Sequence, residues 1–257
     1  MLKNLNKSTK IILICIIILY LFFIVVDLNF QNTGSKYSTL AKYIGVLLCF
    51  TLTIMIGTKG HDVIDTKLLQ SAFLFTAFAD YCLLISNEFI VGVLIFCIVQ
   101  IIYIFRFTRH LISRGKIFIC ILSVYTVFAL VVFTIYKIYG FDLKLSLICL
   151  LYACLIIASL ITAIRTLSSG FFPFYASMMI CIGMILFFMC DVNVFLFNIL
   201  ELSGGYFAGI CGFLIWLFYL PAQVLLSLSG YKYINKKDLT IVNHTNNTVD
   251  NANNHTV

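Results

Sequence analysis

Two aspartates occupy positions at which an ionisable side chain is expensive. Asp80 lies within the apolar run LFTAFADYCLLI, and Asp191 lies within GMILFFMCDVNVFLFN. A carboxylate in hydrocarbon costs about 2.5–3.5 kcal/mol on insertion scales, so such residues face a polar interior and are functional candidates by default. Two carboxyls can also divide the work of catalysis: one donates a proton while the other activates water or stabilises a cation.

The surrounding sequence indicates that these residues lie in a membrane. The 257-residue chain is 62% hydrophobic and 11% charged, with a mean hydropathy of +1.09. A transmembrane helix needs about 17–25 apolar residues. The chain is therefore predicted to be an all-α, polytopic membrane helix bundle of about eight transmembrane helices, an integral multi-pass protein (of the cell membrane, if bacterial). The expected spans are residues 11–26, 40–57, 67–85, 89–105, 116–137, 143–164, 172–197 and 206–229.

The two aspartates are expected at matched depth. The third and seventh spans run in the same direction, and each aspartate precedes the outer end of its span by five or six residues. Of the ten acidic residues, only these two are expected within spans; the other eight are assigned to loops, span ends and the tail. Matched depth allows the two carboxyls to share one pocket.

The chain is expected to form one transmembrane domain, residues 1–230, followed by a tail. Residues 231–257 are polar and rich in Asn, which predicts a disordered cytoplasmic tail. FTAFADYCLL in the third span resembles ILFFMCDVNVF in the seventh, and each is followed by a span with a Gln and a Tyr. This weak echo suggests a 4+4 helix pseudo-repeat with parallel halves.

Other polar residues recur at helical spacing and are expected to line the same pocket. Thr76 precedes Asp80 by one turn, and Asn198 follows Asp191 by two turns. Each of these polar residues, taken alone, could equally serve to bond a neighbouring helix. The further pairs that share a helical face are Gln100 with Tyr103, Tyr152 with Ser159, and Tyr219 with Gln223.

Several other kinds of chemistry lack their residues. The four histidines fall in loops or the tail, so neither a His-ligated zinc site nor a Ser–His–Asp triad is expected in the membrane. The ten cysteines lie in spans without CxxC spacing, which indicates packing roles. No P-loop, GxGxxG or HExxH occurs. We expect no cofactor, no metal and no nucleic acid, since membrane topology explains the net charge of +7.

The polar residues fall in motifs that resemble the YhhN-like lysoplasmalogenase family of multi-pass membrane proteins. FADYCLLISNEFIVGVLIFCIVQIIYIFRF (78–107) resembles that family's G/A-D-x-x-L-L run, followed by G-x-x-x-F and a late polar residue and Tyr. GMILFFMCDVNVFLFN (183–198) resembles its G-x-x-x-F-x-x-S-D hallmark, and YLPAQVLL (219–226) its closing Y-x-x-A-Q-x-L-I. Lys42 resembles the family's lysine of the second span, and Tyr152 its tyrosine of the sixth. Two residues depart from the pattern: Gln100 replaces the usual His, and Cys190 the usual Ser.

The resemblance implies an enzyme that cleaves the vinyl ether bond of lysoplasmalogens, which are single-chain ether phospholipids of the membrane. The products would be a fatty aldehyde and a glycerophospho-head group. Lys42 would either pair with the lipid phosphate or be an ordinary interfacial lysine. Two alternatives use the same pocket: a small transporter with a carboxyl proton relay, and a lipid-binding or sensing protein. The implied catalytic residues are Asp80 and Asp191, and the implied substrate-binding residues are Lys42, Gln100, Tyr103, Tyr152, Asn198, Tyr219 and Gln223.

Both termini are predicted to lie in the cytoplasm, because thirteen of the seventeen Lys and Arg residues then occupy cytoplasmic segments. A reporter fused after Val257 should therefore report a cytoplasmic location. The tail sequons at Asn243, Asn246 and Asn254 should stay unglycosylated in a eukaryotic host. A glycan on the wild-type tail would contradict the topology and require an odd number of spans.

Overall fold

The fold is all-helical throughout the part of the chain that the computed structural model describes, residues 6–30, 35–110, 114–139, 142–201 and 206–232. Eight helices in this part are long and apolar enough to cross a membrane, which confirms the predicted fold class. The predicted tail lies outside the described residues from 233 onward. The helices are α1 (Lys7–Phe30), α2 (Lys36–Ile54), α3 (Val63–Leu84), α4 (Phe89–Phe107), α5 (Arg114–Tyr139), α6 (Leu143–Ser169), α7 (Phe174–Glu201) and α8 (Tyr206–Leu228), with a short 3₁₀ turn, η2 (Gly57–Lys59), before α3.

Local sequence signals set several helix ends. Ser35 precedes α2, and its side chain accepts a hydrogen bond from the Ser38 N–H at 3.2 Å. Asp142 caps α6 in the same way, through the Leu145 N–H at 3.1 Å. Gly170 ends α6 in the left-handed conformation, at φ 65°, which glycine adopts without steric cost. These caps satisfy backbone groups that have no partner within the helix.

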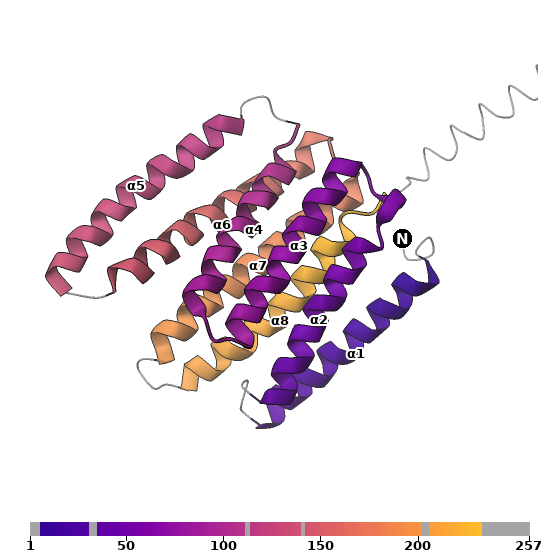
Figure 1. The fold of residues 1–257 in the computed structure, drawn as a ribbon, viewed down its shortest axis with the longest axis horizontal. Helices are drawn as coiled ribbons and strands as arrows, with labels where there is room; N and C mark the ends of the chain where they lie inside the picture. The colour runs from indigo at the N-terminus through magenta and orange to yellow at the C-terminus, as the bar shows by residue number, and fades with distance from the viewer. Residues whose placement is uncertain (1–5, 31–34, 111–113, 140–141, 202–205, 233–257) are drawn as a thin grey trace, which may run out of the picture.

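Six of the helices close a ring around a common interior (Figure 1). In the order α2, α3, α4, α6, α7, α8, each packs against the next, and α8 packs against α2. Helix α1 lies outside the ring against α2 and α8, and α5 lies outside it against α6. The neighbours of α1–α4 therefore correspond to those of α5–α8: the first helix of each half lies outside the ring, and the other three follow one another around it. An origin by duplication stays a prediction.

Two glycines allow neighbouring ring helices to approach closely, Gly92 beside Asp80 and Gly183 about two turns before Asp191. A Cβ atom at Gly92 of α4 would lie 2.6 Å from the Leu83 side chain and 3.3 Å from the backbone oxygen of Ala79, the residue before Asp80. A Cβ atom at Gly183 of α7 would lie 2.9 Å from Leu226. Small residues at such crossings are the usual means of tight helix packing in membranes.

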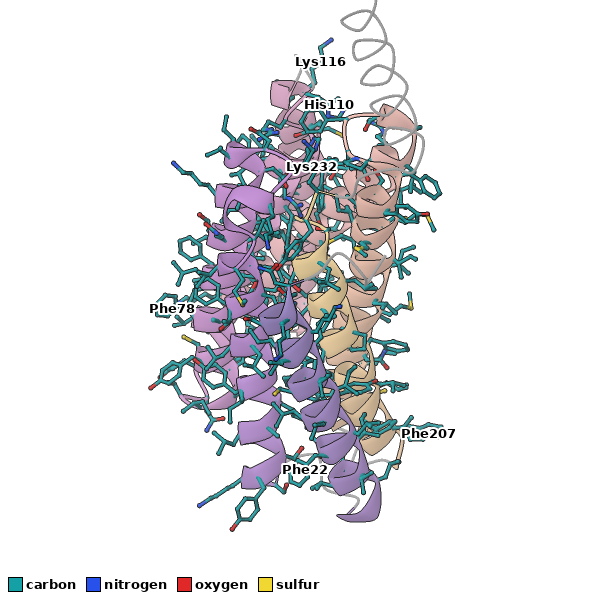
Figure 2. The ribbon with its side chains drawn as sticks, turned by 90° about the vertical axis from the view of Figure 1, so that its right-hand side faces the viewer. Phe22, Phe78, His110, Lys116, Phe207 and Lys232 are labelled. Carbon is teal, nitrogen blue, oxygen red and sulfur yellow. The ribbon has the colours of Figure 1, made fainter. Side chains whose placement is uncertain are left out.

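The face of the bundle at which α1 begins and α8 ends is called here the terminal face. Thr9 and Tyr231 share a hydrogen bond there at 3.4 Å, and the Lys232 N–H donates to the Lys59 carbonyl at 2.9 Å. Figure 2 shows His110, Lys116 and Lys232 towards this end, and Phe22 and Phe207 towards the opposite end. Both described ends of the chain thus lie on one face; the side of the membrane that it faces stays a prediction.

The prediction that only Asp80 and Asp191 lie within spans is wrong. Asp65, in the first turn of α3, is 0% exposed, and Asp27, within α1, is 4% exposed. Asp65 accepts hydrogen bonds from Arg106 Nε at 2.9 Å and Nη2 at 3.0 Å. Asp27 lies 2.8 Å from the Lys42 ammonium. Hydropathy assigns charges near span ends to the interface, because it cannot detect that another helix supplies the opposite charge.

The buried Arg106–Asp65 pair makes a testable contribution to stability. Arg106 also donates to Ser229 Oγ at 2.9 Å, so the pair links α3 and α4 to the residue following α8. The variant Arg106→Met should lower the free energy of unfolding by about 3–5 kcal/mol, because it leaves the Asp65 charge buried without its cation. The double variant Arg106→Met/Asp65→Leu should recover much of this loss in equilibrium unfolding from mixed micelles.

The control is Arg165→Met, at an exposed arginine near the terminal face, which should change the stability by at most about 0.5 kcal/mol. If the double variant were as unstable as Arg106→Met, the lost arginine packing, and not an unpaired carboxylate, would be the cause.

Candidate active site

Asp80 and Asp191 lie at the same distance from the terminal face. Each is seventeen residues beyond the first residue of its helix, α3 or α7, and both helices begin at that face. At 1.5 Å per residue, roughly 25 Å of helix separates each aspartate from that end. The two carboxyls are near enough to interact electrostatically. The structure therefore has the matched depth that the spans indicate.

Each aspartate accepts a short hydrogen bond from a tyrosine on another helix. Tyr219 of α8 donates to Asp80 Oδ2 at 2.7 Å, and Tyr152 of α6 donates to Asp191 Oδ2 at 2.7 Å. Asp80 and Tyr219 are each 4% exposed, whereas Asp191 and Tyr152 are half-buried. Four ring helices thus meet at one level, and the site is more open at Asp191 than at Asp80.

A chain of hydrogen bonds leads to Asp191 from α6 through α4. Ser159 Oγ donates to Gln100 Oε1 at 2.7 Å, and Gln100 Nε2 donates to Tyr152 Oη at 3.5 Å. Tyr152 then donates to Asp191, so every donor in the chain points towards the carboxyl, and such chains reinforce one another in an interior of low dielectric. Gln100 can fill this role because a neutral amide both donates and accepts. This series of hydrogen bonds therefore does not need the imidazole that the family pattern usually has at position 100.

Aromatic rings hold the two tyrosines in place. Phe187 packs against the Tyr219 ring at 5.6 Å between centroids and against Phe96 at 6.0 Å. Phe96 in turn contacts Tyr152 at 6.3 Å, and Trp216 contacts Tyr219 edge-on at 5.4 Å. These contacts restrict the tyrosine hydroxyls to the side of the ring interior where the carboxyls lie. Aromatic rings therefore form much of the wall beside the two tyrosines.

The structure brings most of the sequence-predicted site residues together, but not all. Tyr103 and Gln223 are fully buried in the ring helices α4 and α8. Asn198 is exposed and donates to the Val194 carbonyl of its own helix at 2.8 Å, away from the aspartates. Lys42 is 1% exposed, and its ammonium is engaged by Asp27 and lies 5.0 Å from the centre of the Trp216 ring. Contact of Lys42 with a lipid phosphate stays a prediction.

Sequence reasoning missed buried groups that belong to the same interior. Arg106 follows Tyr103 by three residues and so shares its face of α4, a signal that could have placed it inside the bundle. The thiol of Cys49, on α2, is fully buried and near enough to Asp80 to interact electrostatically with it. The Cys190 thiol is likewise near enough to Asp80 and Asp191 to interact electrostatically with both. Cys49 follows Lys42 by seven residues and so shares its face of α2, a spacing that could have placed the thiol inside the bundle.

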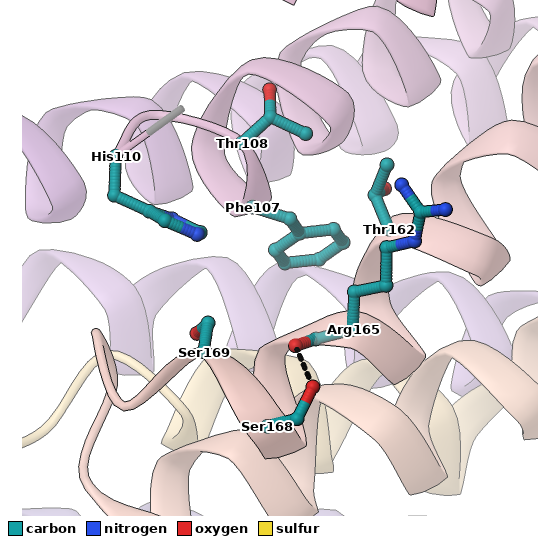
Figure 3. Close-up of a pocket in the computed structure, with 7 residues that line it drawn as sticks. All are labelled: Phe107, Thr108, His110, Thr162, Arg165, Ser168 and Ser169. Carbon is teal, nitrogen blue, oxygen red and sulfur yellow. Dashed lines mark hydrogen bonds between the residues drawn. The ribbon is translucent and has the colours of Figure 1, made fainter. Parts of the chain in front are cut away.

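A separate pocket of about 320 Å³ opens near the terminal face between α4 and α6. Figure 3 shows the Phe107 ring between His110 on one side and Thr162 and Arg165 on the other. Ser168 Oγ donates to the Arg165 carbonyl at 3.2 Å. The pocket contains neither aspartate, and in the described residues no three His, Cys, Asp or Glu side chains are grouped as metal ligands would be. The lining residues are Phe107, Thr108, His110, Thr162, Arg165, Ser168 and Ser169.

Fold and site together define a polytopic membrane protein in which a six-helix ring encloses two carboxyls, each bonded to a tyrosine. The chain belongs to the YhhN family, whose sequence profile matches residues 37–230. The match runs from the second residue of α2 to two residues beyond α8, and so covers the whole ring. The comparisons with curated proteins and with solved structures returned no match. Family membership confirms the resemblance found in the motifs around Asp80, Asp191 and Tyr219.

Proposed function

We propose that this YhhN-family protein hydrolyses the vinyl ether bond of lysoplasmalogens, releasing a fatty aldehyde and a glycerophospho-head group. The observation that carries the proposal is the pair of carboxyls, Asp80 and Asp191, held at one depth inside the ring by hydrogen bonds from Tyr219 and Tyr152. The motif resemblance supplies the substrate class. The residues supply chemistry that suits it, because acid–base catalysis by two carboxyls is sufficient to hydrolyse a vinyl ether.

The first step would be protonation of carbon. One carboxyl, in its neutral form, gives its proton to the β-carbon of the vinyl ether. The π electrons form the new C–H bond, and a lone pair of the ether oxygen stabilises the resulting oxocarbenium ion. The other carboxyl, in its ionised form, stabilises this cation, as in glycosidases that act through an oxocarbenium-like species.

The second step would be addition of water to the oxocarbenium carbon. A water oxygen forms the new C–O bond while its proton passes to the ionised carboxyl. As the hemiacetal breaks its bond to the glycerol oxygen, its hydroxyl gives up its proton and the glycerol oxygen takes one up, so that the aldehyde is released with no net change in protons. Proton exchange between the two carboxyls then restores the starting state. One water molecule is consumed for each bond cleaved, and no metal or redox cofactor takes part in this scheme.

The lesser burial of Asp191 and Tyr152 supports lateral access by a lipid. Asp191 and Tyr152 are half-buried although they lie deep in their helices, whereas Asp80 and Tyr219 are enclosed. The aromatic walls formed by Phe96, Phe187 and Trp216 suit the apolar chain of a single-chain lipid. Gln100 and Tyr219 would act as positioning residues, because they reach the reacting atoms only through Tyr152 and Asp80.

The catalytic role predicts that Asp80→Asn and Asp191→Asn each lower kcat by about 10²–10⁴-fold, the usual contribution of a general acid or base. The double variant should be little worse than either single variant, because the two groups act as a unit. The asparagine carbonyl can still accept the tyrosine hydrogen bond, so the variants should remain folded in the membrane. The assay is aldehyde release from a lysoplasmalogen by purified protein in detergent.

A matched control is Asp142→Asn, which keeps a good capping residue at the exposed start of α6 and should retain full activity. Full activity in either single site variant would refute the two-carboxyl mechanism. Activity lost only together with the amount of folded protein would instead indicate a packing role for the aspartate.

The mechanism also predicts the type of bond that is cleaved. A saturated 1-alkyl ether analogue should inhibit competitively but survive, because it has no alkene carbon to protonate. A lyso-acyl ester should survive as well, since the site pairs no serine with a histidine. In ¹⁸O-water, aldehyde trapped before carbonyl exchange should carry the label. Label in the glycerol hydroxyl, or rapid ester cleavage, would reject the mechanism; binding of the vinyl ether without turnover would favour the lipid-binding alternative.

A further inference from the structure

Three buried side chains in the ring have polar atoms without a hydrogen-bond partner among the described residues. The atoms are Thr76 Oγ1, Tyr103 Oη and both amide atoms of Gln223. All three residues are 0% exposed. Buried polar groups are nearly always paired with protein or with ordered water, and leaving one unpaired is costly. Four such atoms on three helices therefore indicate a ligand site rather than chance.

The three residues form a column between the carboxyls and the terminal face: counted from the bonded residues Asp65, Arg106 and Ser229, Thr76 lies 11 residues along α3, Gln223 six along α8 and Tyr103 three along α4. Each lies about one helical turn from a residue of the candidate active site: Thr76 from Asp80, Tyr103 from Gln100 and Gln223 from Tyr219. Residues three or four apart share a helical face, so the three side chains project into the interior to which those residues belong. The displacement along the helices is roughly 5–6 Å in each case.

This column is closed at its end near the terminal face, but beside Phe107 it nearly reaches the surface. The Arg106–Asp65 pair, with Ser229, lies below it near the terminal face. Between α4 and α6, however, the pocket of Figure 3 reaches Phe107, whose ring stacks on Tyr103 at 5.6 Å with an interplanar angle of 11°. The Phe107 side chain therefore separates the unpaired Tyr103 hydroxyl from a pocket lined by the exposed His110 and Arg165.

We propose that Thr76, Tyr103 and Gln223 bind a small cluster of water molecules, which enters past Phe107 and supplies the nucleophile for hydrolysis. The part concerning the nucleophile rests on the proposed function. Two hydroxyls and an amide offer both donors and acceptors but no charge, which suits a neutral O–H group and not a phosphate. The glycerol hydroxyl of the substrate has the same chemistry. Water is favoured because the column is fully buried and extends towards the terminal face, whereas the less buried residues of the site are Asp191 and Tyr152.

Hydroxyl-radical footprinting by X-ray pulses tests the water site without any assay of activity, since radicals formed from bound water modify the side chains beside it. Tyr103 should be modified within about tenfold of the rate of Tyr37, which is 78% exposed, although Tyr103 itself is 0% exposed. Phe23, which is 0% exposed and lies beside Trp216, is the buried control and should stay unmodified. Modification of Tyr103 as slow as that of Phe23 would overturn the proposal.

Apolar substitutions of similar shape test the role of this water in the reaction. Thr76→Val, Tyr103→Phe and Gln223→Leu should each lower kcat roughly tenfold, the effect of weakening one well-placed hydrogen bond, with an unchanged KM. Their melting temperatures should change little, because each change removes only one of several polar partners of the bound water. The controls Tyr20→Phe and Thr53→Val remove hydroxyls bonded to the Leu217 and Phe50 carbonyls and should keep full activity.

Three kinetic results would overturn either the binding of water by these residues or the role of that water as the nucleophile. If the variants raise the KM for a lysoplasmalogen but not for an analogue without the glycerol 2-hydroxyl, the column binds the substrate and not water. If all three variants keep the wild-type kcat, the water is bound but is not the nucleophile. If the wild-type protein releases no aldehyde at all, the proposed function fails, and footprinting of Tyr103 alone then decides whether water is bound.

Discussion

A carboxyl group deep in a bilayer must be turned away from lipid, and the arrangement of this bundle follows from that constraint. Asp80 and Asp191 lie on helices of the same direction and at the same depth, so a shared interior encloses both at once. Two helices cannot surround a polar group, and here six do so by closing a ring. Helices α1 and α5 carry none of the site residues and lie outside it; no described residue of α5 is buried.

The four aspartates within the helices differ in their partners, and the difference separates structural from chemical roles. Asp65 and Asp27, near the ends of the bundle, pair with Arg106 and Lys42. A carboxylate in such an ion pair cannot give up its charge without leaving a buried cation unpaired. Asp80 and Asp191 are bonded to neutral phenols instead, so either can gain or lose a proton without breaking an ion pair. Only the central pair is therefore suited to acid–base work.

The sequence was sufficient to predict what depends on one helix at a time. Hydropathy predicts eight helices, and the cost of burial identifies Asp80 and Asp191. Spacings of three or four residues identify Tyr103 and Gln223, because neighbours on a helical face point the same way. Asn198 shows the limit of this rule: it shares the face of Asp191 but lies roughly 10 Å further along α7, where the side chain is exposed.

The pattern of residues along a single helix does not predict which helices meet across the interior. The bonds from Tyr219 to Asp80 and from Tyr152 to Asp191 join residues 139 and 39 positions apart, and they depend on the order in which the ring closes. The ion pairs of Asp27 and Asp65 escaped prediction for the same reason, since each cation lies on another helix. A charge near the end of an apolar run has the same appearance in the sequence whether it meets water or a partner.

Hydrolysis of a lipid within a bilayer brings together two reactants that do not mix. In the function proposed here, the lipid reaches the carboxyls from the side, where Asp191 and Tyr152 are half-buried between aromatic walls. Water reaches them from the terminal face, along a column of hydroxyl and amide groups that the protein itself leaves unpaired. The enclosed Asp80 lies where the two routes meet. A ring of helices suits these two routes, because its wall can admit lipid at the depth of Asp191 while its interior stays polar nearer the terminal face.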